Sequence, residues 1–454
     1  MPSIAFRAAW LAGSFGIARA GTQSLTVVML VSLATAQTLP DASNCGNIVQ
    51  VSDSQRMPPF DVDRFLCLPP NFSVSVYARV PAARFLAMTP DGKLLVSQPA
   101  TGSIVLVEKQ DDGSAATFSF DTGLARAQDM LFHDDPDGGT YLYVAEATRI
   151  SRYPYVAGDY GLHDGQVLID GLPSSSSDEL RAAYAHELKN IAVDSGGRIY
   201  VSIASATNAD PSERYSNPAR GAIYVYDPDG SNGRLYAQGL RNAEGVRFFP
   251  GTDLLWAAVN NRDNLAYPFH DDSGWYGQVL QEYVNDHPPD EFTFVRDGGD
   301  YGWPFANPNP ETESGWDNMP FDADMQNNAD GLNQPIDFFD RITKGIPAHS
   351  APLGLTFLQN TNFPAQYADG ALIALHGSWN RNPPTGYKVI YFPWNSDTQL
   401  PGAQQDFASG WLNGDTGQYW GRPVATAIDI EGAVFISDDY SGTIYRVTYS
   451  DPSR

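Results

Sequence analysis

Six positions in the chain place polar side chains directly before apolar, strand-like runs, and most of these side chains are basic. Three of the positions hold Arg and two hold His, although the chain has only 28 Lys and Arg and 7 His. Arginines brought to one place repel each other unless an anion lies between them, and the guanidinium fork suits carboxylates and phosphates. If the fold gathers these positions, we expect a small, buried, anionic ligand. The positions are Arg84, Gln128, His186, Arg241–Asn242, His349 and Arg422.

Two other interpretations of the same residues remain open. The basic side chains could form ion pairs with local acids such as Glu187, Asp129 and Glu244. The two histidines, His186 and His349, could be buried structural residues; neither has the His-x-His or His-x-x-x-His spacing that favours a metal site. A neutral imidazole beside arginines stays unprotonated near pH 7, which suits a general base.

Several loops add oxygen atoms or an aromatic ring. The run Asn261-Arg262-Asp263 could hold a hard cation through backbone or side-chain oxygens, although such residues are also ordinary turn formers. Trp379 could stack on a planar ligand or simply pack. The other segments that supply polar groups are Ser205–Asp210, which includes Asn208; His376–Arg381; and Asp438–Tyr440.

One hairpin explains how such loops can meet. Two apolar runs, Val246–Phe249 and Leu254–Val259, flank the turn Pro250–Asp253. Residues before the first run and after the second therefore lie at the same end of the hairpin, which brings Arg241–Asn242 close to residues 261–263. Other hairpins of this kind would add their own loops to the same site.

The hairpin belongs to a unit of a polar residue, an apolar strand, a turn, a second strand, a polar loop and a third strand. Six copies recur, at about residues 84–107, 128–153, 186–226, 239–263, 349–392 and 422–447. No copy can bury both faces alone, so we predict an all-β fold, a six-bladed β-propeller over residues 81–450. Residues 262–345 form one long insertion between the fourth and fifth units, and we expect them to wall a cleft.

Charge and the N-terminus indicate where the protein acts. The net charge of −25 disfavours nucleic acid and anionic membranes and leaves neutral small molecules as partners, although it could equally serve solubility.

The apolar run Ser24–Ala36 predicts a secretory signal over residues 1–36; a misassigned start or an uncleaved anchor is the alternative. In an oxidising compartment Cys45 and Cys67 should pair and staple residues 37–80. Asn71-Phe72-Ser73 is a glycosylation sequon.

A series of motifs in one order resembles a known family. The motifs are His186–Asp194 with Gly197–Tyr200, Gly239–Gly245, Asp300–Pro304, His349–Leu355, His376–Arg381 and Gly421–Pro423. Over about residues 60–449 the chain resembles the soluble dehydrogenases that use pyrroloquinoline quinone (PQQ), above all the fungal pyranose dehydrogenases of auxiliary activity family 12 and the L-sorbosone dehydrogenases. The resemblance implies a six-bladed propeller with PQQ and Ca²⁺ on its axis.

The resemblance also implies roles for individual residues. His186 would be the general base, and Arg241 and Asn242 would contact the quinone oxygens. The loop of Asn261, Arg262 and Asp263 would hold Ca²⁺ through backbone carbonyls. The remaining residues implied to bind or line the cofactor are Arg64, Arg84, Gln128, His349, Trp379, Arg381 and Arg422.

Two departures from the family bear on the substrate. The bacterial glucose-oxidising branch has an acid just before its catalytic His, whereas this chain has Ala185, so the partner that orients His186 is unassigned. Arg422-Pro-Val replaces an Arg-x-Arg pattern. These departures disfavour glucose, and the resemblance implies oxidation of 2-keto-glucose, L-fucose or a similar pyranose at the anomeric carbon, with electrons passed to a cytochrome b domain or another redox protein. We expect a secreted protein, and a monomer because the blades show no leftover apolar stripe.

Two further functions compete with this one. A calcium-dependent lactonase on the same propeller would hold its metal with carboxylate and Asn side chains on the axis, whereas this axis is mostly cationic. A non-catalytic propeller that binds a partner would have a dry apolar or a uniformly acidic axial face, which the Arg and His positions disfavour.

Overall fold

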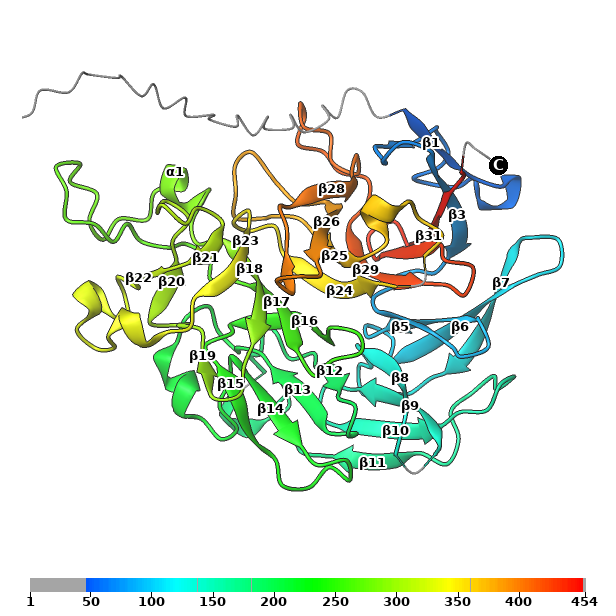
Figure 1. Ribbon diagram of the computed structural model, residues 1–454, viewed down its shortest axis with the longest axis horizontal. Helices are drawn as coiled ribbons and strands as arrows, with labels where there is room; N and C mark the ends of the chain where they lie inside the picture. Colours follow the sequence, from blue (N-terminus) through cyan, green and yellow to red (C-terminus); the bar gives the residue numbers. More distant parts are fainter. Residues whose placement is uncertain (1–45, 137, 181, 360, 452–454) are drawn as a thin grey trace, which may run out of the picture. The chain divides into compact units, whose positions relative to one another are not determined.

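A computed structural model describes residues 46–136, 138–180, 182–359 and 361–451, and all structural statements below refer to these residues. Six sheets of four to six strands surround one axis (Figure 1). The prediction of an all-β, six-bladed propeller is confirmed. The predicted signal segment 1–36 and Cys45 lie outside the described residues, so the leader and the Cys45–Cys67 disulfide stay predictions.

The first three blades follow the chain without a break, each with its first strand innermost. The first blade contains β4 (Leu86–Met88), β5 (Leu94–Gln98), β6 (Ser103–Lys109) and β7 (Ala115–Asp121). The second contains β8 (Met130–Asp134), β9 (Thr140–Ala145), β10 (Ile150–Pro154) and β11 (Gln166–Ile169). The third contains β12 (Asn190–Val193), β13 (Ile199–Ile203), β14 (Ala222–Tyr226) and β15 (Arg234–Gln238), with β19 (Gly299–Asp300) parallel to β15 at its edge.

The last three blades draw strands from more distant parts of the chain. The fourth contains β16 (Asn242–Phe248), β17 (Leu255–Asn260), β18 (Asp290–Val295), β23 (Ile342–Ile346) and β21 (Asp317–Met319). The fifth contains β24 (Pro352–Leu358), β25 (Gly370–Leu375), β26 (Lys388–Asn395), β27 (Leu400–Pro401) and β28 (Gln405–Ala408). The sixth contains β29 (Pro423–Ile428), β30 (Val434–Asp438), β31 (Thr443–Tyr449), β3 (Phe72–Arg79), β1 (Asn47–Gln50) and β2 (Phe65–Leu66).

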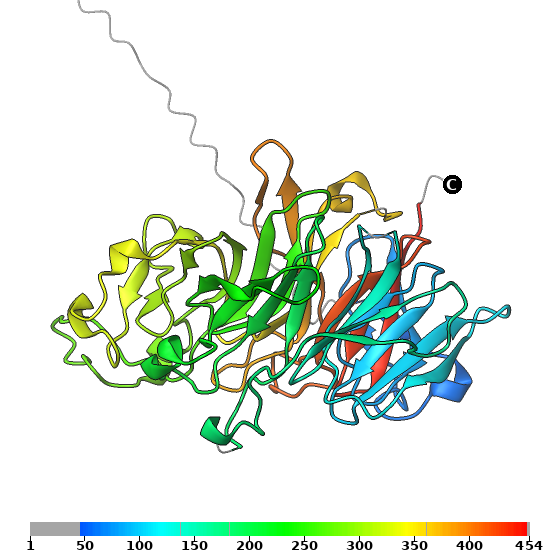
Figure 2. The same cartoon turned by 90° about the horizontal axis from the view of Figure 1, so that it is seen from below.

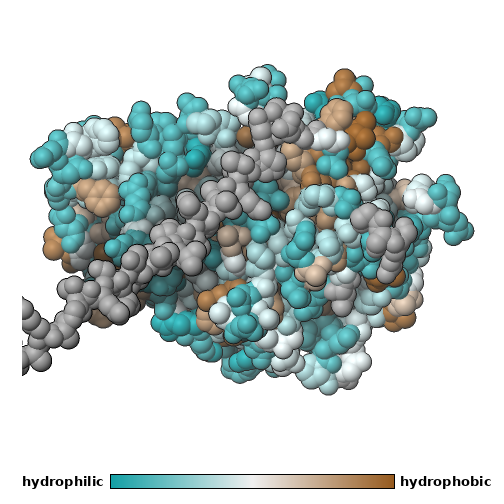
Figure 3. Space-filling model, turned by 45° about the horizontal axis from the view of Figure 1, so that its top comes forward, coloured by the Kyte–Doolittle hydropathy of each residue, from teal (hydrophilic) through white to brown (hydrophobic). Residues whose placement is uncertain are grey.

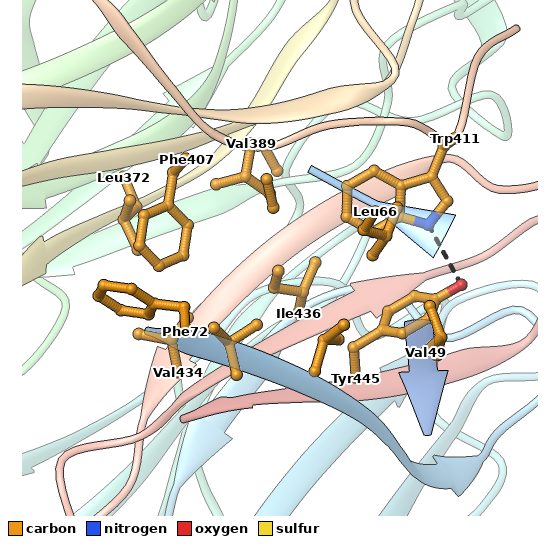
Figure 4. Packing of buried hydrophobic residues seen from close by; sticks show 14 of the residues in the cluster. Val49, Leu66, Phe72, Leu372, Val389, Phe407, Trp411, Val434, Ile436 and Tyr445 are labelled. Carbon is orange, nitrogen blue, oxygen red and sulfur yellow. Dashed lines mark hydrogen bonds between the residues drawn. The ribbon is translucent and has the colours of Figure 1, made fainter. Parts of the chain in front are cut away.

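Both ends of the described chain meet in the sixth blade. Strand β3 pairs antiparallel with β31, and Phe72 lies opposite Tyr449. Segment 37–80, which the sequence analysis set apart from the propeller, therefore supplies three strands of this sheet. Figure 4 shows the apolar core that joins these strands to the fifth blade, where the Trp411 indole donates a hydrogen bond of 3.2 Å to the Tyr445 hydroxyl. Burial of this core explains why the ends stay joined.

The innermost strands form a closed ring, because each contacts the innermost strands of both neighbouring blades. Small residues permit the closest of these approaches. A Cβ at Gly354 of β24 would lie 2.7 Å from Ala425 of β29, so this position has no room for a larger residue. The ring holds the loops at its two ends at fixed distances from the axis.

The predicted insertion 262–345 is not one uninterrupted loop. It contains β18 and β23, which complete the fourth blade. Strand β18 has no clear apolar pattern at its start, because it begins with two acids, Asp290 and Glu291, that are nevertheless buried. The rest of the insertion extends beyond the fourth blade (Figure 2) and contains α1 (Gln281–Val284), a ribbon of β20 (Ala306–Pro308) and β22 (Phe321–Ala323), and the 3-10 turns η5 (Ala329–Gly331) and η6 (Ile336–Phe338).

The remaining 3-10 turns are η2 (Asp53–Gln55), η3 (Asp178–Leu180), η4 (Pro211–Tyr215) and η7 (Ala365–Tyr367). Hydrophilic residues dominate the face drawn in Figure 3, as the strong negative charge leads one to expect. Among the described residues, no helix has the length and apolar character needed to cross a membrane.

Candidate active site

A pocket opens where the loops of the third, fourth and fifth blades meet. Its walls come from residues before the innermost strands, from the loop after β17 and from the loop after β25. The residues that line it are His186, Arg241, Asn242, Asn260, Asn261, Asp263, Asp290, His349, Ala351, Gly377 and Trp379. The structure thus brings together seven of the residues that the sequence analysis singled out.

Irregular strand starts help to direct these residues. In the fourth, fifth and sixth blades the pairing of the innermost strand with the next one shifts near its beginning, at Ala243/Gly245, Pro352/Leu355 and Pro423/Thr426. Such bulges bend a strand and re-aim its side chains. Here they lie next to Arg241, His349 and Arg422.

His186 is held in one orientation by the third blade. Its Nδ1 lies 2.8 Å from the carbonyl oxygen of Ser205 and 3.1 Å from the Ser205 hydroxyl. A carbonyl can only accept, so Nδ1 carries the proton and Nε2 has a free lone pair. Burial and the charge of Arg241 lower the pKa of His186 to about 4. The partner that the sequence analysis left unassigned is therefore Ser205, mainly through its backbone.

Arg241 is a buried cation with a fixed set of partners. Its Nε donates to the carbonyl oxygen of Asn208 at 3.0 Å and its Nη1 donates to that of Asn261 at 2.7 Å. The Asp263 carboxylate lies 3.5 Å from its Nη2. The Arg241 carbonyl in turn accepts from the backbone N–H of Ser205 at 2.8 Å. The backbone of Ser205 therefore hydrogen-bonds both to the His186 ring and to the backbone of Arg241.

Asp263 links Arg241 to His349. The His349 Nδ1 lies 3.6 Å from Asp263 Oδ1, and its Nε2 lies 2.8 Å from the Val284 carbonyl and 3.1 Å from the His287 carbonyl. Burial opposes the charge on His349, but the Asp263 and Asp290 carboxylates outweigh it and raise its pKa. Both ring nitrogens thus face acceptors, so His349 is a donor and not a base.

Oxygen atoms surround the loop after β17. Asp290 accepts backbone N–H groups of Asn261 and Ala351 at 2.9 and 3.1 Å, and burial raises its pKa to about 6. The Asn208 side chain binds both the N–H and the carbonyl of Asp263 at 2.8 Å. These contacts fix the positions of the carbonyl groups that the sequence analysis proposed as cation ligands.

The side chain of Arg262 binds residues of the insertion and does not line the pocket. Its Nη1 contacts Asp324 Oδ2 at 2.5 Å, and its Nη2 contacts Gln326. Asp324 also accepts from the Asn307 amide at 3.0 Å. Only the backbone of Arg262 is therefore available beside the pocket.

Two of the predicted arginines lie next to the pocket without lining it. Arg422 donates to the carbonyl oxygens of His376 and Gly377 at 2.9 and 3.1 Å, and Gly377 is a wall of the pocket. Arg84 pairs with Asp439 at 2.9 Å, and the same carboxylate accepts from His376 at 2.8 Å. Burial lowers the pKa of His376 to about 4.

Three other predicted cofactor residues lie elsewhere. Gln128 is buried and donates to Glu244 at 3.1 Å. Arg64 donates to the Pro59 carbonyl at 2.8 Å and lies over the Trp420 ring. Arg381 contacts the Asn285 carbonyl and pairs with Asp286 at 3.0 Å. Because these contacts hold their side chains away from the pocket, we do not assign them to its ligand.

The acids that the sequence analysis offered as partners of the basic set bind other groups. Glu187 pairs with Arg126, and Asp129 pairs with Arg247 at 2.7 Å. Arg84 and Arg241 are instead paired with Asp439 and Asp263. Asp263 lies in the loop after β17 and Asp439 directly follows β30, and these are the second strands of the fourth and sixth blades.

Parts of this chain are similar in sequence to known proteins. A family model described as TrAA12-like matches residues 68–450. A pyrroloquinoline quinone-dependent pyranose dehydrogenase of Coprinopsis cinerea is 26% identical over 294 residues, which cover 54% of this chain and 37% of that protein. The chain spans 48% and 37% of the lengths of the first curated relatives that it matches.

Two solved structures resemble most of the propeller. The holo form of the pyranose dehydrogenase PQQ domain from Coprinopsis cinerea has a TM-score of 0.67 and 19% identity, and covers 85% of this chain and 97% of its own. A calcium structure of an enzyme of family AA12 from Trichoderma reesei has a TM-score of 0.68 and 20% identity, with coverage of 85% and 97%. At these identities the likeness concerns the fold.

Proposed function

Because the chain belongs to the TrAA12-like family, we propose that it is a dehydrogenase that oxidises a pyranose sugar with PQQ and Ca²⁺ in the axial pocket. The observation that carries this proposal is the pair of His186 and Arg241. A histidine kept neutral, with a free Nε2, lies in the same pocket as a buried cation. This combination suits removal of a proton from a substrate whose oxidation delivers negative charge nearby.

The residues present fit PQQ, which is planar and carries three carboxylates. Arg84 and Arg422 flank the pocket, and each guanidinium has more donors than the contacts described above use. Trp379 is 73% exposed, so its ring is free to cover a planar ligand. We propose that Arg84 and Arg422 hold carboxylates and that Asn242 and Arg241 face the quinone oxygens.

The pocket also fits a hard cation. Within the described residues, no cluster of three or more His, Cys, Asp or Glu side chains could hold a metal. We propose that backbone carbonyls of residues 261–263 supply ligands, as the resemblance to the family implies. Each carbonyl has two lone pairs, so the Arg241 contact to Asn261 leaves one free. Ca²⁺ accepts such mixed oxygen ligands.

The reaction follows from the roles of the protein groups. Bound PQQ would supply the acceptor for a hydride from the sugar carbon. His186 Nε2 accepts the proton of the sugar hydroxyl, while its Nδ1–H stays bonded to Ser205. Arg241 stabilises the negative charge that develops beside it, in a geometry fixed before the substrate arrives. The protein thereby supplies orientation and charge, and the cofactor supplies the redox chemistry.

We further propose that the protein is secreted, that it acts on 2-keto-glucose, L-fucose or a related pyranose at the anomeric carbon, and that a cytochrome b domain or another redox protein takes its electrons. A panel of these sugars, with glucose for comparison, should be assayed by dye reduction after loading with PQQ and Ca²⁺. Reduction that needs both supports the proposal. Hydrolysis of a lactone in the absence of PQQ would support the lactonase instead.

The neutral state of His186 predicts a pH dependence of stability. Its pKa rises from about 4 in the folded protein to its ordinary value of about 6.5 in the unfolded chain. For His186 the unfolded chain binds more protons between these values, so this residue contributes an increase in the free energy of unfolding as pH rises from about 4 to 6.5. His376 acts in the same direction, whereas the buried carboxyl groups of Asp290 and Glu291, whose pKa values are raised to about 6 and about 8, act in the opposite one. Urea denaturation of the cofactor-free protein should therefore give a less positive pH slope for His186→Gln than for the unchanged protein; equal slopes would contradict the prediction.

A second prediction concerns the loop that carries Trp379. The Asn285 side chain, just after α1, donates to the Asn382 carbonyl at 2.7 Å and accepts from the Asn382 N–H at 2.9 Å. Asn285→Ala removes both hydrogen bonds, so the loop should hold Trp379 less firmly. We expect the Kd for PQQ to rise about fivefold, which corresponds to about 1 kcal/mol for two lost hydrogen bonds. The kcat at saturating PQQ should stay within about twofold, since His186 and Arg241 are untouched; a large loss of kcat at unchanged PQQ affinity would contradict this role.

A further inference from the structure

A second pocket lies beside the sixth blade, and we infer that it binds a further pyranose unit of the substrate. We call it the aromatic pocket; its lining includes Asp61, Arg64, Tyr419, Trp420, Tyr440 and Ser441. The inference rests on the proposed sugar dehydrogenase function. It concerns substrates of two or more sugar units, whose first unit would occupy the axial pocket.

The rings of the aromatic pocket are already in place. Tyr419 and Tyr440 meet edge to face with centroids 4.9 Å apart. Tyr419 also stacks on Tyr387 at 4.7 Å, and the Trp420 indole donates to the Gly410 carbonyl at 2.9 Å. Rings fixed in this way lose little conformational freedom when a ligand binds. Tyr440 is 58% exposed, so its ring is accessible to a ligand from solvent.

Polar groups accompany the rings. Arg64 lies over Trp420, with its guanidinium carbon 5.5 Å from the ring centroid, and its Nε donates to Pro59. Its other N–H groups and the exposed carboxylate of Asp61 offer donors and acceptors at the rim. A pyranose presents C–H groups on its faces and hydroxyl groups at its edge. The aromatic rings can contact the C–H faces of the sugar, and Arg64 and Asp61 can form hydrogen bonds with its hydroxyl groups.

A short chain of contacts connects the aromatic pocket to the axial pocket. Tyr419 lies 5.8 Å from the guanidinium carbon of Arg422. Arg422 donates at 3.1 Å to the carbonyl of Gly377, a wall of the axial pocket. Tyr440 directly follows Asp439, which pairs with Arg84. Arg422 therefore lies between Tyr419 and a wall of the axial pocket, and the inferred saccharide extends past it.

The net negative charge of the protein disfavours anionic ligands in the aromatic pocket. A net charge of −25 disfavours nucleotides and acidic polysaccharides. A neutral saccharide meets no such repulsion. An aromatic electron acceptor would also contact these rings, but it does not require the hydroxyl-binding groups Asp61 and Arg64; the experiment below separates the two ligands.

Binding should be measured with sugars that cannot react. Methyl glycosides are blocked at the anomeric carbon, so titration of the cofactor-free full chain, read by tryptophan fluorescence, reports binding apart from catalysis. The probes are methyl glucoside and the methyl glycosides of cellobiose, laminaribiose and maltose. We expect at least one disaccharide to bind about tenfold more tightly than methyl glucoside, and Tyr440→Ala to abolish that difference. Tyr215→Ala, which alters another exposed tyrosine in η4, should preserve it.

Several outcomes would overturn the inference. One is that no disaccharide binds more tightly than methyl glucoside; another is that both Tyr440→Ala and Arg64→Gln leave disaccharide binding unchanged. A higher KM for the dye acceptor in Tyr440→Ala, with saccharide binding unaffected, would assign the pocket to the electron acceptor. These titrations contain no PQQ, so their failure is distinct from a failure of the proposed cofactor to bind.

Discussion

His186→Ala should lower the kcat for sugar oxidation by about a thousandfold, because the variant has no group that can accept the hydroxyl proton. The affinity for PQQ should change little, since His186 bonds to Ser205 and carries no charge. Steady-state dye reduction and a separate PQQ titration measure the two quantities. The result to expect is therefore a loss in kcat without a loss of cofactor.

The control for this variant is His270→Ala, which removes an exposed histidine of the insertion. It should keep the full rate. Added imidazole provides a sharper test, because it can enter the space left by His186→Ala and restore part of the proton transfer. A variant with more than a tenth of the normal kcat would show that another group is the base.

Arg241→Met should lower kcat by about a hundredfold, the range found when a preorganised charge-stabilising donor is lost. It should also lower the free energy of unfolding by about 1 kcal/mol, because the partly buried Asp263 loses one of its two cationic partners and keeps only His349. Arg241→Lys keeps the charge but cannot donate to Asn208 and Asn261 together, so we expect most of the kinetic loss and less of the destabilisation.

Rates and thermal unfolding of both Arg241 variants should be compared with Arg234→Met. Arg234 forms an exposed ion pair with Asp297, so its removal should alter neither quantity appreciably. If Arg241→Lys reacted at the normal rate, charge alone would be sufficient and the fixed geometry of Arg241 would have no catalytic role.

Apolar periodicity and turn residues predicted the ring of six blades and the meeting of their loops in one pocket. The strand periodicity around Arg241 and the turn Pro250–Asp253 sufficed to place residues 241–242 beside residues 261–263, and the structure has them in one pocket. The same logic applied to His186 and His349. Each position depends only on the start or end of a strand, which apolar periodicity reveals.

What sequence patterns could not predict depends on contacts between distant segments. The support of His186 is a backbone carbonyl, and a carbonyl exists at every residue, so Ser205 had no distinguishing signal. Asp290 follows two prolines inside the insertion and enters the pocket only because β18 completes the fourth blade. Arg64 and Arg381 had the right charge, but tertiary contacts with Trp420 and Asn285 place them elsewhere.

The central claim is that the axial pocket holds PQQ together with Ca²⁺, and a binding titration tests it most directly. The metal-stripped full chain should be titrated with PQQ by calorimetry, with and without added Ca²⁺. We predict tight binding of one PQQ per chain that depends on Ca²⁺ and weakens in Arg422→Met, which lacks one of the flanking cations. Failure of PQQ to bind in the presence of either Ca²⁺ or Mg²⁺ would contradict the claim.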